Sequence, residues 1–346
     1  MMLRFMKPSR PMRTQVLLVY PTDATFIEND LRLIGTFCDV TPFRYTDRSC
    51  FPRLIRSIAR SDLVFMWFAL GFAAVSGLVA RLMKKPTVLV AGGWDVVGLP
   101  EIGYGRLLTA RGSITAAAAL SLADEVLAFS DWSARAIKSV APRSRIRRSY
   151  PGIDTAKFQP AKKERLVLSV GNVSRENLLR KGFRDFVQVS RAFPEVPFYL
   201  VGRHLDEAVE ELRRTAGQNM HITGWISEAE LLDLLSRAQV YVQCSYNEGF
   251  GVALAEAMAS GCVPVVVGTG AIPEVVGDTG IYAKFGELDD LAAAIRTALD
   301  SETGLAARAR AVEKFNEQYR LADLRAAFNR VLSKAPRRKS EAAGGY

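Results

Sequence analysis

The chain has 346 residues, of which 49% are apolar and 24% charged, values typical of a large folded protein that can form two domains. Its four cysteines show no Cys-x-x-Cys spacing and it has two histidines, which excludes a disulfide scaffold and a histidine-rich metal site and favours a reducing compartment. The net charge of +10 lies in the first half: residues 1–150 carry 21 Lys and Arg against 11 Asp and Glu, whereas residues 151–346 carry 25 of each.

The first half of the chain alternates apolar strand segments with amphipathic helices. This alternation is typical of a parallel sheet covered by helices on both faces. Ser130 directly precedes one predicted helix and is expected to cap it. The predicted strands are 15–20, 40–43, 63–68, 87–90 and 126–129, and the predicted helices are 27–37, 51–61, 104–123 and 131–140.

The stretch Leu63–Ala80 contains no charged residue and approaches the length of a membrane span. Its first part, Leu63–Phe68, has the composition of a buried parallel strand. Its second part contains Gly71 and Gly77 and is followed by the strand 87–90. We therefore interpret the stretch as a strand and helix of the sheet rather than as a transmembrane helix. The N-terminal residues 1–13 are basic and lack an apolar core of signal length, so we predict no secretion signal.

A second strand–helix series follows a basic, turn-rich segment, 142–160, which is interpreted as a linker. Two such series predict two doubly wound domains, residues 1–150 and 151–314, that face each other across a cleft at the carboxyl ends of their strands. A last amphipathic helix is expected within 315–334, and the polar residues 335–346 are expected to be disordered. The predicted strands of the second series are 165–171, 198–201, 221–223, 240–243 and 263–267, and its helices are 181–192, 205–216, 228–237 and 288–300.

The segment 247–280 points to a nucleotide-sugar. Glu248 and Glu256 stand eight positions apart, and the loop Gly249-Phe250-Gly251 between them opens an alanine-rich helix that begins near Val252. Glycine lets the loop backbone approach a ligand closely. The N-terminus of a helix attracts a diphosphate, and the flanking carboxylates can accept hydrogen bonds from sugar and ribose hydroxyls.

The same segment resembles the donor-binding signature of the retaining glycosyltransferases of family 4, glycosyl transferases group 1, which have the GT-B fold. Their two glutamates are separated by seven residues and followed by a Gly-x-Pro-Val-Val strand and a Gly-x-x-Glu turn. Here these parts are Glu248, Glu256, the run 261–266 and the turn ending at Glu274. The run 150–158 also resembles the signature that ends the first domain in this family. The resemblance implies two Rossmann-like domains and a C-terminal helix, 315–334, that crosses back to the first domain.

A second group of residues follows the strand that ends at Gly171. The resemblance implies two cations here that hold the donor diphosphate. Lys181 matches one of them directly, whereas Asn172 stands where the family has the arginine. Arg175 is the nearest substitute and Arg180 the second. Positive charge is needed because the leaving diphosphate gains negative charge as the glycosidic bond breaks.

Two further donor contacts and the acceptor side are implied by the resemblance. Gly202 and Ile226 are expected to wall the nucleobase. The first domain lacks the Gly-Gly loop that many members carry after the first strand, since residues 21–25 contain no glycine. It also has Gly92 where many members have a histidine, and it keeps the acid Asp95. Asp95 is therefore the catalytic candidate of the first domain, with Glu101 the other acid of that loop.

These features predict an α/β enzyme that transfers a hexose from a nucleoside-diphosphate sugar to an acceptor hydroxyl with retention of configuration. Glu248 would orient the donor sugar, and no metal or other cofactor is expected, because no Asp-x-Asp motif is placed to hold the diphosphate. Two alternatives stay open: a nucleotide-sugar epimerase of the same fold, and a non-catalytic protein that binds nucleotide-sugars.

The basic first half predicts an anionic partner. Its cations are not interleaved with aromatic residues in an RNA-binding pattern, so we expect no nucleic acid. An anionic membrane surface or a lipid-linked acceptor is the preferred partner, and a solvated basic surface is the alternative. The expected location is the cytoplasm, with peripheral membrane association.

Overall fold

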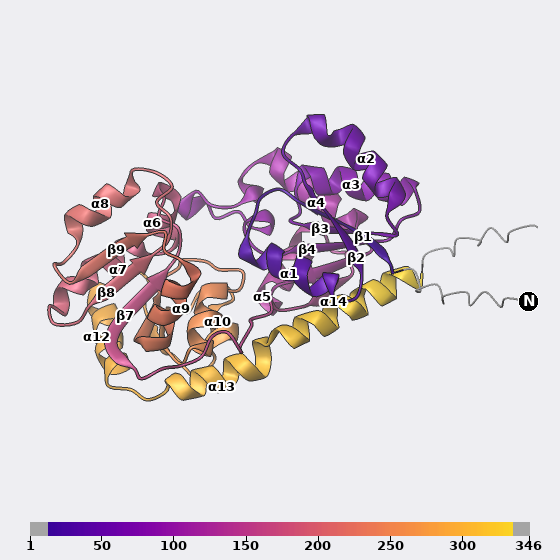
Figure 1. The fold of residues 1–346 in the computed structure, drawn as a ribbon. Coiled ribbons are helices and arrows are strands. Elements are labelled where there is room, and N and C mark those ends of the chain that lie inside the picture. Colours follow the sequence, from indigo (N-terminus) through magenta and orange to yellow (C-terminus); the bar gives the residue numbers. More distant parts are fainter. Residues whose placement is uncertain (1–12, 335–346) are drawn as a thin grey trace, which may run out of the picture.

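The computed structural model describes residues 13–334, so the expectations for residues 1–12 and for the tail 335–346 lie outside the described part of the chain. Two parallel sheets form the centres of two domains that lie side by side (Figure 1). The first sheet has the strand order β2-β1-β3-β4-β5-β6. Its strands are β1 (Gln15–Tyr20), β2 (Asp39–Arg44), β3 (Leu63–Trp67), β4 (Thr87–Ala91), β5 (Glu125–Ala128) and β6 (Ile146–Arg148).

Both faces of the first sheet are buried, as expected for parallel strands between helices. Along β3, Phe65 and Trp67 pack into one hydrophobic cluster, while Val64 and Met66 pack into another on the opposite face. The stretch Leu63–Ala80 thus forms a strand of the sheet and most of a helix that covers it. The covering helices are α1 (Thr25–Gly35), α2 (Phe51–Arg60), α3 (Gly71–Leu82), α4 (Ala110–Leu122) and α5 (Asp131–Val140).

The second sheet has the order β12-β11-β10-β7-β8-β9. Its strands are β7 (Glu164–Val170), β8 (Phe198–Val201), β9 (Met220–Gly224), β10 (Ala238–Gln243), β11 (Val263–Val267) and β12 (Ile281–Ala283). Its helices are α6 (Arg175–Arg180), α7 (Phe183–Val189), α8 (Ala208–Thr215), α9 (Glu228–Arg237), α10 (Val252–Ala259), α11 (Ile272–Val276) and α12 (Leu288–Leu299). The chain order reverses between β7 and β10, so their carboxyl ends form the crevice in which α/β sheets of this type bind ligands.

Several predicted boundaries are corrected by the structure. The helix predicted from Tyr104 begins at Ala110, because the Thr109 side chain caps it by accepting from the Gly112 N–H. The predicted linker 142–160 contains β6, an edge strand whose arginines hid the strand pattern. The helix predicted from Lys181 begins at Phe183, because Gly182, with a φ of +65°, separates it from the preceding helix α6. The short elements α6, α11 and β12 and the twelve-residue helix α13 (Gly304–Phe315) were missed.

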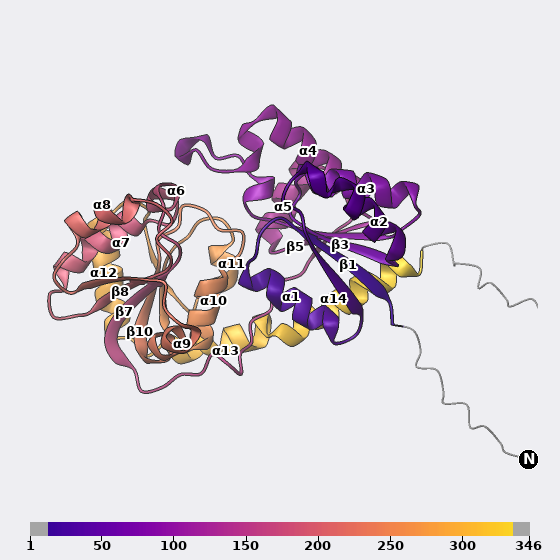
Figure 2. The same cartoon turned by 45° about the horizontal axis from the view of Figure 1, so that its top comes forward.

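The C-terminal helices connect the two domains. The helix α13 (Gly304–Phe315) packs on α10 of the second domain, and α14 (Glu317–Leu332) continues along the first domain (Figure 1, Figure 2). On α14, the fully buried Arg320 pairs with Asp30 of α1, with 2.6 Å between Nη2 and Oδ2, and donates to the Ser149 carbonyl and hydroxyl. This buried ion pair fixes α14 on the first domain. Within residues 13–334, no helix combines the length and apolarity needed to cross a membrane.

Candidate nucleotide-sugar site

Glu248, Lys181 and the glycine loop 249–251 lie at the carboxyl ends of β7 and β10. The loop after β10 runs through Ser245 and Glu248 to Gly251, where α10 begins. The loop after β7 leads into α6, which ends beside Lys181. Gly182 allows the chain after α6 to pack directly against the end of β10. A Cβ at this residue would collide with the Cβ and carbonyl oxygen of Cys244.

Glu248 lies at the centre of this arrangement with a side chain that is 14% exposed. Its Oε1 is 2.9 Å from Lys181 Nζ and 3.7 Å from the Arg180 guanidinium. The same oxygen accepts hydrogen bonds from the Ser245 hydroxyl and the Gln243 amide, at 3.0 and 3.2 Å. Burial acts to raise the pKa of Glu248, but the charges of Lys181 and Arg180 outweigh it and hold the pKa below its usual range. The carboxylate is therefore charged and partly neutralised by two cations.

Arg180 takes a more central position than the sequence predicted. Its Nε and Nη2 donate to Asn177 Oδ1 at 3.0 and 2.7 Å, and its guanidinium lies 4.8 Å from the centre of the Tyr104 ring. Tyr104 belongs to the first domain, so this cation–π contact joins the two domains. Arg175, the first substitute predicted for the missing family arginine, is exposed at the start of α6, and its backbone N–H donates to Asp206. The geometry therefore brings Arg180 rather than Arg175 to Glu248.

Glu256 lies on α10 and makes no side-chain hydrogen bond among residues 13–334. Burial raises its pKa to about 7, while the nearby charges of Lys157 and Glu228 act in opposite directions. Glu228 begins α9, and the first turns of that helix line a pocket with Thr223, Ile226 and Leu234. The predicted ribose acceptor and the predicted nucleobase contact Ile226 thus border the same helix.

The remaining donor-site candidates divide between loop and packing positions. Gly202 has a φ of +154°, and a Cβ there would collide with the Gly171 carbonyl at the end of β7. Gly249 faces the first domain, Gly251 is the left-handed N-cap of α10, and Val252 begins that helix. No side chain among residues 13–334 caps the α10 N-terminus, so its first N–H groups are available to an anion. Phe250 is buried between Tyr150 and Phe315, so its ring packs at the domain junction instead of facing a ligand.

Asp95, the catalytic candidate of the first domain, is completely buried. Its carboxylate accepts from the backbone N–H groups of Ala69 (2.8 Å), Gly93 (3.0 Å) and Gly92 (3.3 Å), and burial raises its pKa. A group enclosed in this way does not reach a substrate. The geometry makes Asp95 a positioning residue for the loop after β4. Glu101, the other acid, is exposed.

Replacing Asp95 with asparagine tests this assignment. The amide group of asparagine places a donor where Asp95 accepts from backbone N–H groups, so we expect a loss of about 1–3 kcal/mol in the free energy of unfolding. Urea denaturation measures this loss. A general base would instead give a variant of normal stability with a large loss of turnover, and that outcome would contradict the positioning role.

Sequence reasoning missed the roles of three groups that the structure places at the contact between the domains. Tyr104 reaches Arg180 from the first domain, and burial raises its pKa to about 12. Ser133 and Glu274 make contacts between the domains. The turn containing Glu274 was recognised as part of the motif, but nothing in the sequence indicated that its partner lies in the other domain.

The fold defines the class of protein. Two Rossmann-like domains with a donor crevice between them form a GT-B fold, and solved structures superpose along nearly the whole chain. Sucrose-phosphate synthase from Thermosynechococcus elongatus has a TM-score of 0.75 at 18% identity and covers 93% of this chain and 100% of its own. Anabaena HepE, in complex with UDP and glucose, has a TM-score of 0.75 at 17% identity and covers 92% of this chain and 100% of its own.

The family comparison concerns the second domain. Residues 153–318 match the family model described as glycosyl transferases group 1, which places this part of the chain in that group of transferases. The MMP alpha-(1->4)-mannosyltransferase of Mycolicibacterium hassiacum is 36% identical over 123 residues, which cover 33% of this chain and 30% of the relative. The GDP-mannose:cellobiosyl-diphosphopolyprenol alpha-mannosyltransferase of Xanthomonas campestris is 26% identical over 229 residues, 62% of this chain and 58% of the relative. The matched segments thus span about a third to somewhat over half of these relatives.

Proposed function

We propose that this protein is a retaining glycosyltransferase of family 4 that transfers a hexose from a nucleoside-diphosphate sugar to an acceptor hydroxyl. The observation that carries the proposal is the placement of Glu248 with Lys181 and Arg180 at the β7–β10 crevice, facing the first domain. Relatives named as sugar transferases and a structural neighbour described with UDP and glucose support a nucleotide-sugar donor.

The donor diphosphate is assigned to the space between Lys181, Arg180 and the uncapped N-terminus of α10. The two cations and the helix N–H groups supply positive charge where the leaving diphosphate gains negative charge. This arrangement provides the stabilisation without a bound metal. Lys181 pairs with Glu248 Oε1, so a bound diphosphate would compete with this carboxylate for the lysine.

The nucleoside is assigned to the pocket beside α9. Glu256 accepts hydrogen bonds from the ribose hydroxyls, and Ile226 contributes an apolar wall for the base. Gly202 lets the end of β8 pack against the Gly171 carbonyl, which shapes the backbone beside this pocket. Glu248 is left to bind the hydroxyls of the donor sugar, where it orients the anomeric carbon toward the first domain.

The proposed step is a front-face displacement. The acceptor oxygen forms a bond to the anomeric carbon as the bond from that carbon to the phosphate oxygen breaks, and the acceptor proton passes to the leaving phosphate. A double displacement would need a carboxylate on the opposite face of the sugar. Asp95 does not supply it, because its oxygens are enclosed by backbone N–H groups.

Incubating the purified protein with a panel of UDP- and GDP-sugars tests the function. Release of nucleoside diphosphate that depends on an added acceptor supports transfer. Conversion of the donor into an isomeric sugar would instead identify an epimerase. Binding without turnover across donors and acceptors would identify a nucleotide-sugar binding protein.

We also propose that the first domain contacts an anionic membrane from the cytoplasmic side. The C-terminal end of α3 exposes Leu78 and Leu82, by 50% and 76%, next to the exposed cations Arg81 and Lys84. Exposed apolar side chains with neighbouring cations are typical of a surface that binds anionic lipid. All four cysteines are free and buried, which suits a reducing cytoplasm.

The double variant Arg81→Gln/Lys84→Gln is expected to bind acidic liposomes more weakly. Each cation near such a surface contributes about 1 kcal/mol, and binding of the wild type should fall with salt, because charges are screened over about 10 Å at 0.1 M. Liposome flotation measures both effects. The double variant Lys162→Gln/Lys284→Gln changes the same charge on the second domain and should bind like the wild type. A wild-type protein that stays free of acidic liposomes at low salt would contradict the membrane proposal.

A further inference from the structure

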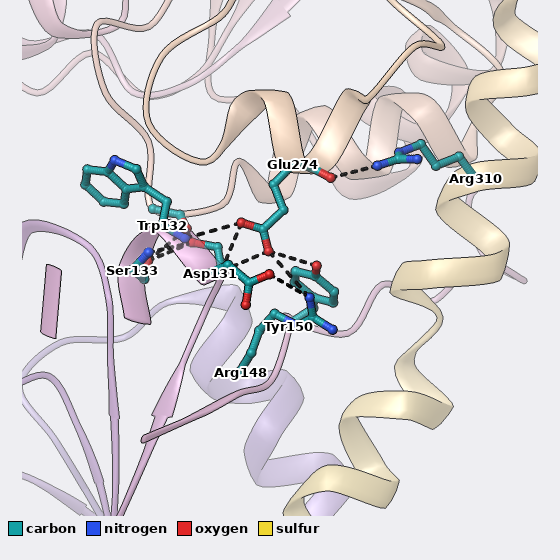
Figure 3. Close-up of polar contacts among 9 residues, drawn as sticks. Asp131, Trp132, Ser133, Arg148, Tyr150, Glu274 and Arg310 are labelled. Atoms are coloured by element: carbon teal, nitrogen blue, oxygen red, sulfur yellow. Dashed lines mark hydrogen bonds and ion pairs between the residues drawn. The ribbon is translucent and has the colours of Figure 1, made fainter. Parts of the chain in front are cut away.

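The N-terminus of α5 in the first domain receives a carboxylate from the second domain. Both oxygens of Glu274 lie 2.9 Å from the Asp131 backbone nitrogen, and Oε2 lies 3.3 Å from that of Trp132 (Figure 3). Asp131 and Trp132 are the first two residues of α5, whose N–H groups have no partner within the helix. Glu274 therefore completes the cap of this helix from across the cleft.

Ser130 shows why a partner from the other domain is needed. Its hydroxyl accepts from the Ser133 N–H at 2.9 Å, which satisfies one free donor of the first turn. The Ser130 hydroxyl does not accept from the Asp131 and Trp132 N–H groups, which donate to Glu274 instead. A negative charge is also favoured here by the dipole of the helix.

The same end of α5 holds the loop that carries Glu248. The Ser130 hydroxyl donates to the Gly249 carbonyl at 2.8 Å. The Ser133 hydroxyl lies 3.1 Å from that carbonyl and 2.6 Å from the carbonyl of Gly92 in the first domain. A Cβ at Gly249 would collide with the Gly92 carbonyl, so the two chains are in close contact at this point. Two segments of the second domain, the loop that contains Gly249 and the turn that contains Glu274, thus contact the same helix of the first domain.

The two docked loops also form one unit. The Ala271 N–H donates to the Glu248 carbonyl at 2.9 Å. Gly270, with a φ of +59°, lies so close to Glu248 and Asn247 that a Cβ there would contact their backbone and side-chain atoms. A displacement of Glu274 would therefore be transmitted directly to the backbone of Glu248.

Three neighbours hold Glu274 in place. The Tyr150 hydroxyl donates to Glu274 Oε1 at 2.8 Å, and the Arg148 guanidinium, 4.6 Å from the centre of the Tyr150 ring, lies 4.0 Å from the same oxygen. Arg148 also pairs with Asp131 at 2.9 Å, so its positive charge offsets the negative charges of both Asp131 and Glu274. From α13, Arg310 donates to the carbonyls of Val275 and Glu274, at 2.7 and 2.9 Å (Figure 3).

We infer that Glu274 is a positioning residue for the transfer reaction, because it docks the donor module on α5 and sets the closed arrangement of the two domains. This inference rests on the proposed function. The donor pocket around Lys181 and Glu256 lies within the second domain, so nucleotide binding does not need Glu274. Transfer needs it, since the acceptor side is aligned with the donor sugar only when the cleft is closed.

The variant Glu274→Gln tests the inference through three measurements on the full-length protein. Glutamine offers one acceptor oxygen and turns an N–H donor toward the α5 N–H groups. We expect kcat to fall about 10- to 100-fold, the equivalent of losing one charge-assisted contact. UDP or GDP affinity measured by calorimetry should stay unchanged, and the radius of gyration from X-ray scattering should increase.

Glu313→Gln is the matched control, because Glu313 is exposed on α13 and the substitution removes the same charge. It should match the wild type in all measurements. If Glu274→Gln does not fold, Tyr150→Phe removes one contact to the carboxylate and should shift kcat and scattering in the same direction by less. Wild-type scattering or wild-type kcat in Glu274→Gln would overturn the inference, as would an equal loss of nucleotide affinity and of kcat/KM. A wild type without turnover on any donor would refute the proposed function, while the scattering comparison would still decide whether Glu274 closes the cleft.

Discussion

Replacing Glu248 with glutamine is expected to lower turnover on the order of 10- to 100-fold, the kinetic equivalent of losing a charge-assisted hydrogen bond of about 1.5–3 kcal/mol. Glutamine has nearly the same shape and can keep the contacts to Ser245 and Gln243. It removes the charge that we assign to the donor sugar. The loss should therefore appear in kcat, measured as acceptor-dependent release of nucleoside diphosphate.

The affinity for the bare nucleoside diphosphate should not fall in this variant. Lys181 pairs with Glu248, and removing the carboxylate releases that lysine for the diphosphate. Calorimetry with UDP and GDP should give binding as tight as or tighter than that of the wild type. The exposed Glu195→Gln provides the control for a general loss of charge. An equal loss of affinity for the bare nucleotide and for the nucleotide-sugar would contradict the assignment of Glu248 to the sugar.

The sequence predicted the donor module well because its signals are local. Glycines, a small-residue helix and two glutamates lie within one segment, and the structure shows the expected order of β10, loop, α10 and β11. The choice between Arg175 and Arg180 depends on how α6 is oriented, since Arg180 ends this helix and turns toward Glu248 while Arg175 begins it at the surface. No periodic pattern marks so short a helix, so the sequence could not decide.

The contacts between the domains were beyond the reach of sequence reasoning. Glu274 and Asp131 are separated by 143 residues, and their meeting depends on the packing of two complete domains. Asp95 shows a related limit. An acidic residue after a strand is as consistent with a catalytic group as with a side chain that anchors the backbone. The structure shows that Asp95 is completely buried and accepts from three backbone N–H groups, which decides for the anchor.

Replacing Glu256 with glutamine should have two opposite effects, weaker nucleotide binding and a more stable fold. If Glu256 binds the ribose, the loss of its charge should weaken nucleoside-diphosphate binding by about 1.5–3 kcal/mol, with no sugar needed. Calorimetry measures this loss. The affinity of the wild type for a nucleotide-sugar should also fall as the pH drops below about 7, the pKa that burial gives this carboxyl, and the glutamine variant should lack that dependence. A nucleotide-sugar is the better ligand here, because its phosphates do not titrate near pH 7.

The effect on stability follows from the same pKa. The carboxyl has a pKa of about 7 in the folded protein and an ordinary value of 4.5, so folding favours its protonated form. Its contribution to stability is fully present below pH 4.5 and is lost as the pH rises through about 7. At pH 8 the buried charge costs up to about 3 kcal/mol, at 1.36 kcal/mol per pH unit, and less where solvent reaches the group. Glu256→Gln should therefore raise the melting temperature at pH 8 and change it little near pH 5, which thermal unfolding at the two pH values measures.

Together, the two effects separate a ligand-binding carboxylate from a structural one. A structural glutamate stabilises the fold, so its removal lowers the melting temperature, whereas a charge kept for a ligand is held at a cost to the fold. Glu195→Gln should change neither quantity, since that side chain is exposed. Unchanged nucleotide affinity in a folded Glu256→Gln protein would remove Glu256 from the ribose site. A lower melting temperature at pH 8 would show that its carboxylate is satisfied within the protein, and the nucleoside would then have to lie elsewhere along the crevice.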